Sequence, residues 1–189
     1  MAGGHGRGLI AMNDDEGAPE PRGPFVVRRA TMGDAEPIAR VHTSAWQAAY
    51  LGILDDEYLA ALDWHERAAR WVDLLGRNDG ATILVALVDA QVVAFATGGR
   101  SRDPEAVGDE LYAIYVLPEL WGRGLGSLLL ERMISGFLAS TPITLWVLED
   151  NTPAIAFYSR HGFAPDGVSK LAHIGGRDVR EIRLVRGAD

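Results

Sequence analysis

The sequence predicts a single mixed α/β domain, and two observations support this fold class. The chain has 189 residues, of which 48% are hydrophobic, and this is enough to build one compact core. Strand-like and helix-like segments also alternate along it in the order β, α, α, β, β, β, α, β, α, β, β. A strand–helix–strand crossover at the centre of this order is typical of a mixed sheet with helices packed on it.

The first residues, 1–24, differ from the rest of the chain. They contain six glycines and three prolines, with an acidic patch at 14–16. Such a composition buries too little apolar surface to order itself. We therefore expect a disordered N-terminal extension over 1–24 and a folded domain over 25–189, with either Met1 or Met12 as the start.

The first half of the domain is predicted to be mainly helical. A short strand at Phe25–Arg29 opens it. A helix is expected over about 34–49, because apolar residues recur there at the i, i+3, i+4 spacing of one helix face. Gly52 offers a stop to this helix. A second helical stretch is expected over about 55–75, with a break near Asp63.

The middle of the chain is rich in residues that favour β-strands. Thr82–Val88 and Gln91–Thr97 flank a turn at Asp89–Ala90, and this pattern predicts a hairpin. A polar loop over 98–109 follows the hairpin. The next strand is expected at Glu110–Val116.

The last third is predicted to alternate between helices and strands. A strongly amphipathic helix is expected from about Gly124 to Ala139, with a strand at Thr144–Leu148 after it. A short helix follows at Thr152–His161. The closing pair of strands is expected at 163–168 and 180–185.

Composition excludes several classes of function. A formal net charge of −8 argues against nucleic acid as a partner, and no apolar run is long enough for a membrane span or a signal peptide. The chain has no cysteine, which excludes disulfides, thiolate metal sites and a cysteine nucleophile, and fits a cytoplasmic protein. His42 falls on an apolar helix face and is expected to be structural. The other histidines lack metal-ligand spacing, so we expect no metal; they are His5, His65, His161 and His173.

The segment from Val116 to Ser127 carries the most chemical information. Pro118 ends the preceding strand, and three glycines at 122, 124 and 126 then allow a loop whose N–H groups point to one centre. The helix that follows adds its unpaired N–H groups and the positive end of its dipole. Together these features predict a pyrophosphate cradle. By spacing alone, an ordinary glycine-rich turn before a helix stays open, whereas dinucleotide-binding and P-loop patterns do not fit.

Two motifs resemble signatures of the GCN5-related N-acetyltransferase (GNAT) superfamily. Val116-x-Pro118 followed by Gly122-Arg123-Gly124-Leu125-Gly126 is similar to the acetyl-CoA signature Q/R-x-x-G-x-G/A, with Trp121 in place of Gln or Arg. The run from Asn151 to Phe163 resembles the second signature, N-x-x-A-x-x-F-Y-x-x-x-G-F. The resemblance covers about residues 25–186, and the predicted element order agrees with the family fold.

This resemblance implies a fold, a cosubstrate and a reaction. The fold is a single, mostly antiparallel twisted sheet flanked by helices, with two splayed central strands at 110–116 and 144–148. Acetyl-CoA would place its pantetheine arm between these strands and its pyrophosphate on 122–127, and the acetyl group would pass directly to a primary amine in a ternary complex. Residues expected to contact acetyl-CoA are Ile114, Tyr115, Val116, Trp121, Gly122, Arg123, Gly124, Leu125, Gly126, Ser127, Asn151, Ala154, Phe157 and Tyr158.

Catalytic roles follow from the same resemblance and from proton chemistry. Tyr158 matches the family tyrosine beside the CoA sulfur and is interpreted as the general acid or a hydrogen-bond donor to the thiolate, the alternative being a core aromatic residue. Glu110 opens the strand that faces the acceptor and is the candidate base, the alternative being a solvated strand end. Asn151 either fixes the loop beside the cosubstrate or caps the following helix. Trp46 and Tyr50 resemble the residues that shape the acceptor pocket. Trp64 and Trp71 are expected in the core, the alternative being a place near that pocket.

The acceptor itself is not encoded in any motif. A small-molecule amine and a protein amino group both fit, and the acidic composition favours a cationic acceptor. A non-catalytic acyl-CoA-binding sensor or partner-binding module is the alternative from another class, and transfer of a longer acyl group is a third. Because dimers are common in the family, a homodimer is also compatible with the resemblance.

Overall fold

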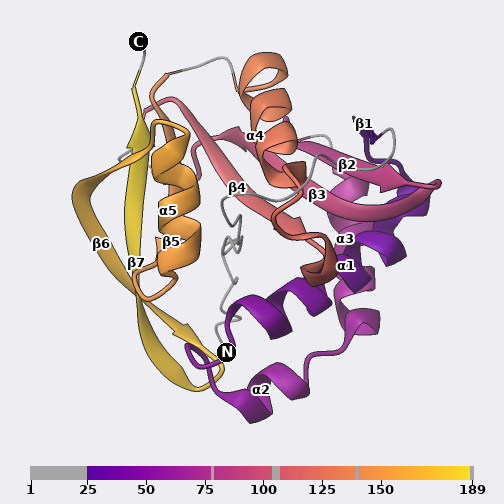
Figure 1. Cartoon of the computed structure of the whole chain (residues 1–189), viewed down its shortest axis with the longest axis horizontal. Helices are drawn as coiled ribbons and strands as arrows, with labels where there is room; N and C mark the ends of the chain where they lie inside the picture. Colours follow the sequence, from indigo (N-terminus) through magenta and orange to yellow (C-terminus); the bar gives the residue numbers. More distant parts are fainter. Residues whose placement is uncertain (1–24, 78, 104–106, 139–140, 188–189) are drawn as a thin grey trace.

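The computed structural model describes residues 25–77, 79–103, 107–138 and 141–187, so the expected extension over 1–24 lies outside the described residues. One seven-stranded sheet, in the order β1-β2-β3-β4-β5-β7-β6, forms the centre of the molecule (Figure 1). Its strands are β1 Val26–Arg29, β2 Thr82–Val88, β3 Gln91–Arg100, β4 Asp109–Val116, β5 Ile143–Leu148, β6 Ala164–Ile174 and β7 Arg177–Arg186. The helices are α1 Ala35–Ala49, α2 Asp56–Ala60, α3 Trp64–Gly76, α4 Leu125–Gly136 and α5 Thr152–Arg160, with 3₁₀ turns η1 Met32–Asp34 and η2 Pro118–Leu120.

Most predicted elements are confirmed, and the helical stretch over 55–75 is broken where expected. The side chain of Asp63 accepts a hydrogen bond of 2.8 Å from the backbone N–H of His65 and so caps α3. Helix α4 ends at Gly136 rather than near 139. It ends there because the N–H groups of Phe137 and Leu138 both donate to the carbonyl of Met133, which stops the regular ladder.

Three strands, β3, β6 and β7, are longer than predicted. Strand β3 continues through Gly98 and Gly99 to Arg100, into the expected polar loop, because the backbone there pairs with β4. A Cβ on Gly98 would lie 2.9 Å from the carbonyl oxygen of Glu110, so this close approach requires glycine. The closing strands β6 and β7 are likewise longer than expected. Most of β6 is exposed as a sheet edge, so it lacks the apolar alternation that would have revealed its length.

The two central strands β4 and β5 run parallel but pair only at their beginnings. Their register consists of Asp109 opposite Ile143 and Glu110 opposite Thr144. Beyond these pairs β4 remains bonded to β3, and β5 remains bonded to β7 along its whole length. The strands therefore splay apart toward their C-terminal ends (Figure 1), which confirms this part of the predicted fold.

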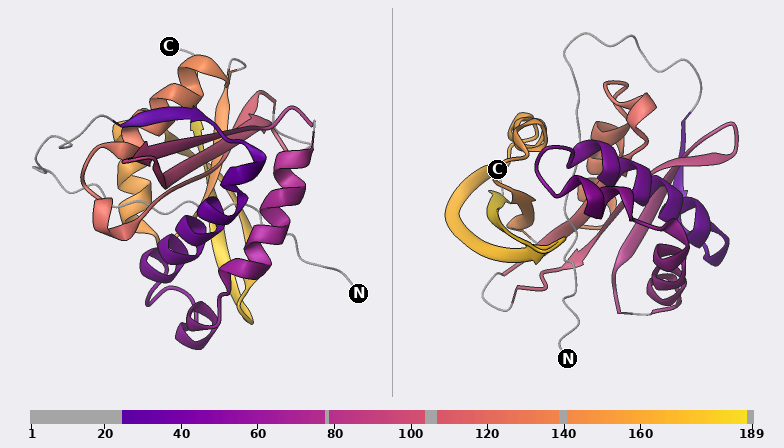
Figure 2. Two further views of the ribbon diagram at one scale, coloured as in Figure 1. Left: turned by 90° about the vertical axis from the view of Figure 1, so that its right-hand side faces the viewer. Right: turned by 90° about the horizontal axis from the view of Figure 1, so that it is seen from below.

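Helices cover the sheet on two faces, shown from two further directions in Figure 2. Helix α4 packs on β2, β3 and β4, and α5 belongs to the same hydrophobic cluster; we call this the α4 face. Helix α1 packs on β3 and β4, with α3 against it, and we call this the α1 face. A register shift in the β3–β4 pairing leaves Tyr112 as an extra residue, so Ile114 and Val116 lie on the α4 face while Tyr115 lies on the α1 face.

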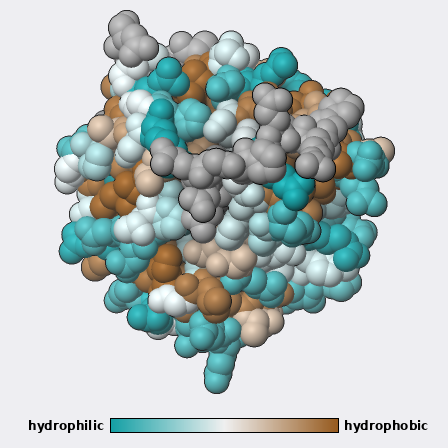
Figure 3. Space-filling view, in the orientation of Figure 1, coloured by the Kyte–Doolittle hydropathy of each residue, from teal (hydrophilic) through white to brown (hydrophobic). Residues whose placement is uncertain are grey.

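The outer surface is mixed. On the side seen in Figure 1, hydrophilic areas surround small separate hydrophobic ones (Figure 3). Within the described ranges, no helix is long and apolar enough to cross a membrane. In the same ranges, no group of three or more His, Cys, Asp or Glu side chains is placed to hold a metal ion.

The start of α1 is fixed by a buried carboxylate, that of Asp34. It accepts two hydrogen bonds from the Arg28 guanidinium, at 2.7 and 2.9 Å, and two from Thr31, at 2.7 Å from the N–H and 2.8 Å from the hydroxyl. The hydrogen bond from Arg28 is the main cause that lowers the pKa of Asp34 from 3.8 to about 2, although burial opposes it. The ionised carboxylate is therefore the form that the fold stabilises.

We expect Asp34→Asn to lower the free energy of unfolding by about 1–2 kcal/mol at pH 7, because charge-assisted hydrogen bonds are lost. Since the folded-state pKa is the lower one, this contribution is complete above about pH 4 and is lost as the pH falls toward 2. Urea unfolding of both proteins at pH 7 and pH 3 measures the effect. An equal penalty at the two pH values would contradict the electrostatic origin.

Candidate functional site

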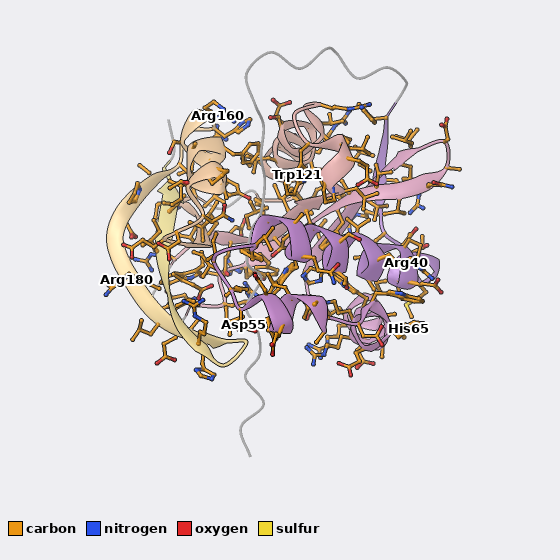
Figure 4. The ribbon with its side chains drawn as sticks, turned by 60° about the horizontal axis from the view of Figure 1, so that its bottom comes forward. Arg40, Asp55, His65, Trp121, Arg160 and Arg180 are labelled. Carbon is orange, nitrogen blue, oxygen red and sulfur yellow. The ribbon has the colours of Figure 1, made fainter. Side chains whose placement is uncertain are left out.

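The loop between β4 and α4 is held by hydrogen bonds to the end of the strand. The indole N–H of Trp121 donates to the carbonyl of Val116 at 2.9 Å, and the N–H of Leu117 donates to the carbonyl of Val93 at 2.9 Å. Trp121, which is part of this loop, is labelled in Figure 4. Trp121 therefore fastens the loop to β4, a role that the sequence motif did not indicate.

Glycines shape the predicted cradle. Gly122 and Gly124 have φ of 72° and 75°, a left-handed conformation that other residues adopt only with strain. The first hydrogen bond of the helical ladder runs from the N–H of Leu128 to the carbonyl of Gly124, at 3.0 Å. The N–H groups of residues 125–127 precede it, and no side-chain cap bonds to this end of α4 within the described chain.

This helix end fits an anionic group. A Cβ built on Gly124, the N-cap next to these amides, would meet no atom within 4 Å. Arg123 is exposed beside them, and Gly126 is buried inside the first turn. Uncapped amides, the helix dipole and a neighbouring guanidinium are the features that bind phosphate groups in proteins. The structure thus brings together the loop residues that the sequence predicted for pyrophosphate.

Ser127 has a partner that the sequence did not predict. Its hydroxyl lies 3.0 Å from Nε2 of His161, the residue that follows the last turn of α5. This contact joins the first turn of α4 to the end of α5. The predicted contact of Ser127 with pyrophosphate stays a prediction.

Helix α5 presents the second motif to the α4 face. The side chain of Asn151 accepts a hydrogen bond of 3.2 Å from the N–H of Ala154, so the capping interpretation of Asn151 is confirmed. Ala154, Phe157 and Tyr158 are all fully buried. The ring of Tyr158 lies 4.9 Å from that of Phe157 and 5.7 Å from that of Phe163. These contacts fix the direction of the phenol, whose predicted role as an acid stays a prediction.

Three aromatic side chains meet on the α1 face. The indole N–H of Trp46 donates to the hydroxyl of Tyr115 at 2.8 Å, and the hydroxyl of Tyr50 lies 3.3 Å from the same oxygen. Burial raises the pKa of Tyr50 well above that of an ordinary tyrosine and also raises that of Tyr115. Both phenols are therefore neutral hydrogen-bonding groups at pH 7. The structure brings the predicted acceptor-side residues to the splayed strand β4.

The interpretation of His42 as structural is confirmed. Its ring packs against Trp46, Trp71, Phe95 and Tyr115, and Nη1 of Arg67 lies 3.1 Å from its Nε2. Burial, with help from nearby arginines, lowers its pKa well below the usual value. Trp71 is buried as expected. Trp64 is only partly buried, and the Arg40 guanidinium lies 3.6 Å from its ring centre.

Glu110 is buried rather than solvated, with 2% of its surface exposed. Its carboxylate accepts hydrogen bonds from the backbone N–H of Arg102 at 2.8 Å and from the guanidinium of the same residue, Nε lying at 3.2 Å. It belongs to the last paired position before β4 and β5 separate. The interpretation of Glu110 as a solvated strand end is therefore wrong, and its role as a base is not decided by these contacts.

One pair of charged residues on the α1 face was missed by the sequence reading. Glu181 of β7 is buried, with 2% of its surface exposed, and its Oε2 lies 3.2 Å from Nζ of Lys170 on β6. The same Nζ lies 3.6 Å from the centre of the Trp146 ring on β5. Nothing local marks Glu181, because the contact depends on the pairing of three strands. A usable signal did exist, since Lys170 is the only lysine in the chain.

A mixed sheet whose central strands part beside an uncapped glycine-rich helix start defines the acyl-CoA N-acyltransferase class of fold. The model of the acetyltransferase (GNAT) family matches residues 39–163. The chain is 31% identical over 162 residues to an uncharacterised N-acetyltransferase, YuaI, of Bacillus subtilis, covering 84% of this chain and 90% of the relative. It is 30% identical over 149 residues to the L-amino acid N-acetyltransferase AaaT of Escherichia coli, covering 77% and 86%. This protein therefore belongs to the acetyltransferase (GNAT) family.

Solved structures agree on the fold. The PaiA N-acetyltransferase of Thermoplasma acidophilum, solved in complex with coenzyme A, superposes with a TM-score of 0.65. It covers 87% of this chain and 99% of its own, at 20% sequence identity. This likeness covers most of the chain, so the GNAT-like fold predicted from the sequence is confirmed.

Proposed function

We propose that the protein transfers the acetyl group of acetyl-CoA directly to a primary amine in a ternary complex. One observation carries the proposal: the splay between β4 and β5 opens beside the uncapped start of α4. An extended thioester-bearing arm and a pyrophosphate can therefore be bound by adjacent parts of the molecule. The N-acetyltransferases among its relatives support the reaction class.

Binding of the donor would use mainly backbone groups. The pyrophosphate would accept hydrogen bonds from the amides of 122–127, with Arg123 adding positive charge. The pantetheine amides would pair with β4 near Ile114 and Val116, along the side where β5 has moved away. Hydrogen bonds of this kind tolerate sequence change, because they depend on chain geometry rather than on side chains.

The reaction requires a proton to leave the acceptor. A lysine-like amine with a pKa near 10.4 is neutral in only about one molecule in 2,500 at pH 7, which corresponds to a deficit of about 4–5 kcal/mol. The neutral nitrogen would attack the thioester carbon, the C–S bond would break, and the leaving thiolate would take a proton from Tyr158. Removing the amine proton is the harder task, because a thiol with a pKa near 8.5 leaves readily.

Glu110 is our candidate for the group that accepts the amine proton, directly or through water. It sits where the splay begins, and the guanidinium of Arg102 holds its carboxylate in one orientation.

We expect Glu110→Gln to lower kcat by about 10²–10³-fold while leaving the dissociation constant of acetyl-CoA within about twofold, since general base catalysis is lost and donor contacts are kept. The acidic limb of the pH–rate profile should disappear with it. Arg102→Gln tests the positioning separately, because it keeps the carboxylate and removes only the guanidinium that orients it. If Glu110→Gln keeps the acidic limb, the base lies elsewhere.

For the acceptor we propose a cationic amine, either a small molecule or a protein amino group. The chain carries a net charge of −8, which favours the approach of positive ligands. Trp46 and Tyr50, which contact Tyr115 on the α1 face, would shape the site that receives it. A homodimer remains an expectation from the family resemblance.

A further inference from the structure

Lys170 is chemically unique in this chain. The sequence has 18 lysines and arginines in total, and all but this one are arginines. Its side chain is only 24% exposed, and its Nζ lies 3.2 Å from Glu181 Oε2 and 3.6 Å from the centre of the Trp146 ring. The only side-chain amine of the protein is thus held between a buried carboxylate and an aromatic face.

Strand register places this amine on the acceptor side of the splay. Lys170 lies opposite Glu181, and Glu181 lies opposite Leu148, so the three residues form a row across β6, β7 and β5. Leu148 belongs to the hydrophobic cluster of the α1 face. Trp146 lies two residues earlier on the same face of β5, beyond the last pair with β4.

Glu181 and the proposed catalytic phenol, Tyr158, both influence the pKa of the same residue, Tyr50. The pKa of Tyr50 is raised first by burial and then by Tyr115, with further contributions from Tyr158 and Glu181. The charge of Glu181 also contributes to the raised pKa of Tyr115. The carboxylate that holds the lysine and the proposed acid Tyr158 therefore both lie within electrostatic reach of Tyr50.

Neighbouring cations cannot play the same chemical role. Arg102 is engaged with Glu110, while Arg183 bridges Asp103 at 3.0 Å and Asp166 at 2.7 Å. Guanidinium groups stay protonated at any physiological pH, whereas a lysine can lose its proton and become a nucleophile. The Oε2 atom of Glu181 lies 3.2 Å from Nζ, so this carboxylate is placed to accept a proton from the lysine.

We propose that Lys170 is a self-acetylation site, with Glu181 as its base. The inference rests on the proposed acetyl-CoA-dependent function. The proton of Nζ passes to the Glu181 carboxylate, the neutral Nζ attacks the thioester carbon, and a new N–C bond forms as the C–S bond breaks. The thiolate then receives a proton from Tyr158, giving acetyl-lysine and free coenzyme A. Glu181 then gives up its proton and Tyr158 regains one through solvent, which restores both groups. Acetylation thus removes the positive charge beside Glu181 and leaves its carboxylate able to hold the ammonium of an acceptor, which makes the modification a regulator of the acceptor side.

Intact-protein mass spectrometry after incubation with acetyl-CoA tests this directly. We expect one added acetyl group, mapped to Lys170 by peptide sequencing and absent from K170R, which keeps the charge but has no amine. E181Q should slow the modification by about 10²-fold, because it removes the proton acceptor. Calorimetric titration of each variant with acetyl-CoA shows in parallel that it is folded and binds the donor.

A lysine introduced at a second position distinguishes enzymatic from spontaneous acetylation. Arg180 is exposed, with 53% of its side-chain surface accessible. It directly precedes Glu181 on β7, and successive side chains of a strand point to opposite faces. R180K therefore supplies an exposed amine close in sequence and outside the row. Equal modification of both amines, or of heat-unfolded protein, would overturn the proposal. So would acetyl-CoA binding without any acetyl on Lys170, and this result would leave the proposed function intact, whereas failure to bind acetyl-CoA would remove both.

Discussion

Gly124→Glu should weaken acetyl-CoA binding by at least about 100-fold. Gly124 is the N-cap of α4, with φ of 75° and no atom within 4 Å of the place where its Cβ would stand. A glutamate there would fill this space, place a negative charge beside the pyrophosphate and compete for the same N–H groups. Loss of two charge-assisted hydrogen bonds, at about 1.5–3 kcal/mol each, accounts for an effect of this size. Calorimetric titration measures it.

The control for this variant must carry the same strain and the same charge. Gly80 has φ of 83°, and a Cβ built on it also meets nothing within 4 Å, but it lies before β2 and away from the cradle. Gly80→Glu should bind acetyl-CoA as the parent does, and both variants should lose about 1–2 kcal/mol of stability from the left-handed conformation. Parent-like binding by Gly124→Glu would show that the pyrophosphate lies elsewhere.

Tyr158→Phe should reduce kcat by about 10²-fold or more and change the dissociation constant of acetyl-CoA by less than about twofold. The ring is fully buried between Phe157 and Phe163, so phenylalanine keeps its packing and removes only the hydroxyl. A proton donor used only when the thiolate leaves affects turnover and not ground-state binding. Steady-state release of free thiol, with any amine that supports turnover, provides the measurement.

Tyr112→Phe is the matched deletion of a hydroxyl. This tyrosine lies on β4, and its hydroxyl donates to the carbonyl of Arg100 at 2.6 Å, outside the proposed reaction centre. It should retain the turnover of the parent. Should Tyr158→Phe also retain it, Tyr158 is a core aromatic residue and the acid must be sought among other groups or solvent.

Local patterns predicted the parts of this fold that depend on neighbouring residues. The β2–β3 hairpin follows from two β-rich runs around Asp89 and Ala90, which both adopt positive φ. The cradle follows from glycines between a strand and a helix, and the cap at Asn151 follows from its position before α5. In each case, the residues that determine the geometry lie within a few positions of one another.

Contacts between distant strands could not be read in this way. Glu181 and Lys170 meet only because β6 pairs with β7 in one register. Most residues of β6 are exposed, so its sequence shows no apolar alternation that would predict this pairing. Glu110 was expected at a strand end, but its burial depends on Arg102, which reaches back from the loop after β3. The splay of β4 and β5 was predicted only through the resemblance of the motifs to a known family, because no local sequence pattern indicates where two parallel strands separate.

Calorimetric titration of the unmodified chain with acetyl-CoA is the most direct test of the central claim. We predict saturable binding at one site per chain, with a dissociation constant in the micromolar range, about −8 kcal/mol. Desulfo-coenzyme A and free coenzyme A should both compete with acetyl-CoA, because the cradle and the edge of β4 bind the part that all three molecules share. Absence of binding by correctly folded protein would contradict the proposed donor site and, with it, the acetyl transfer that depends on it.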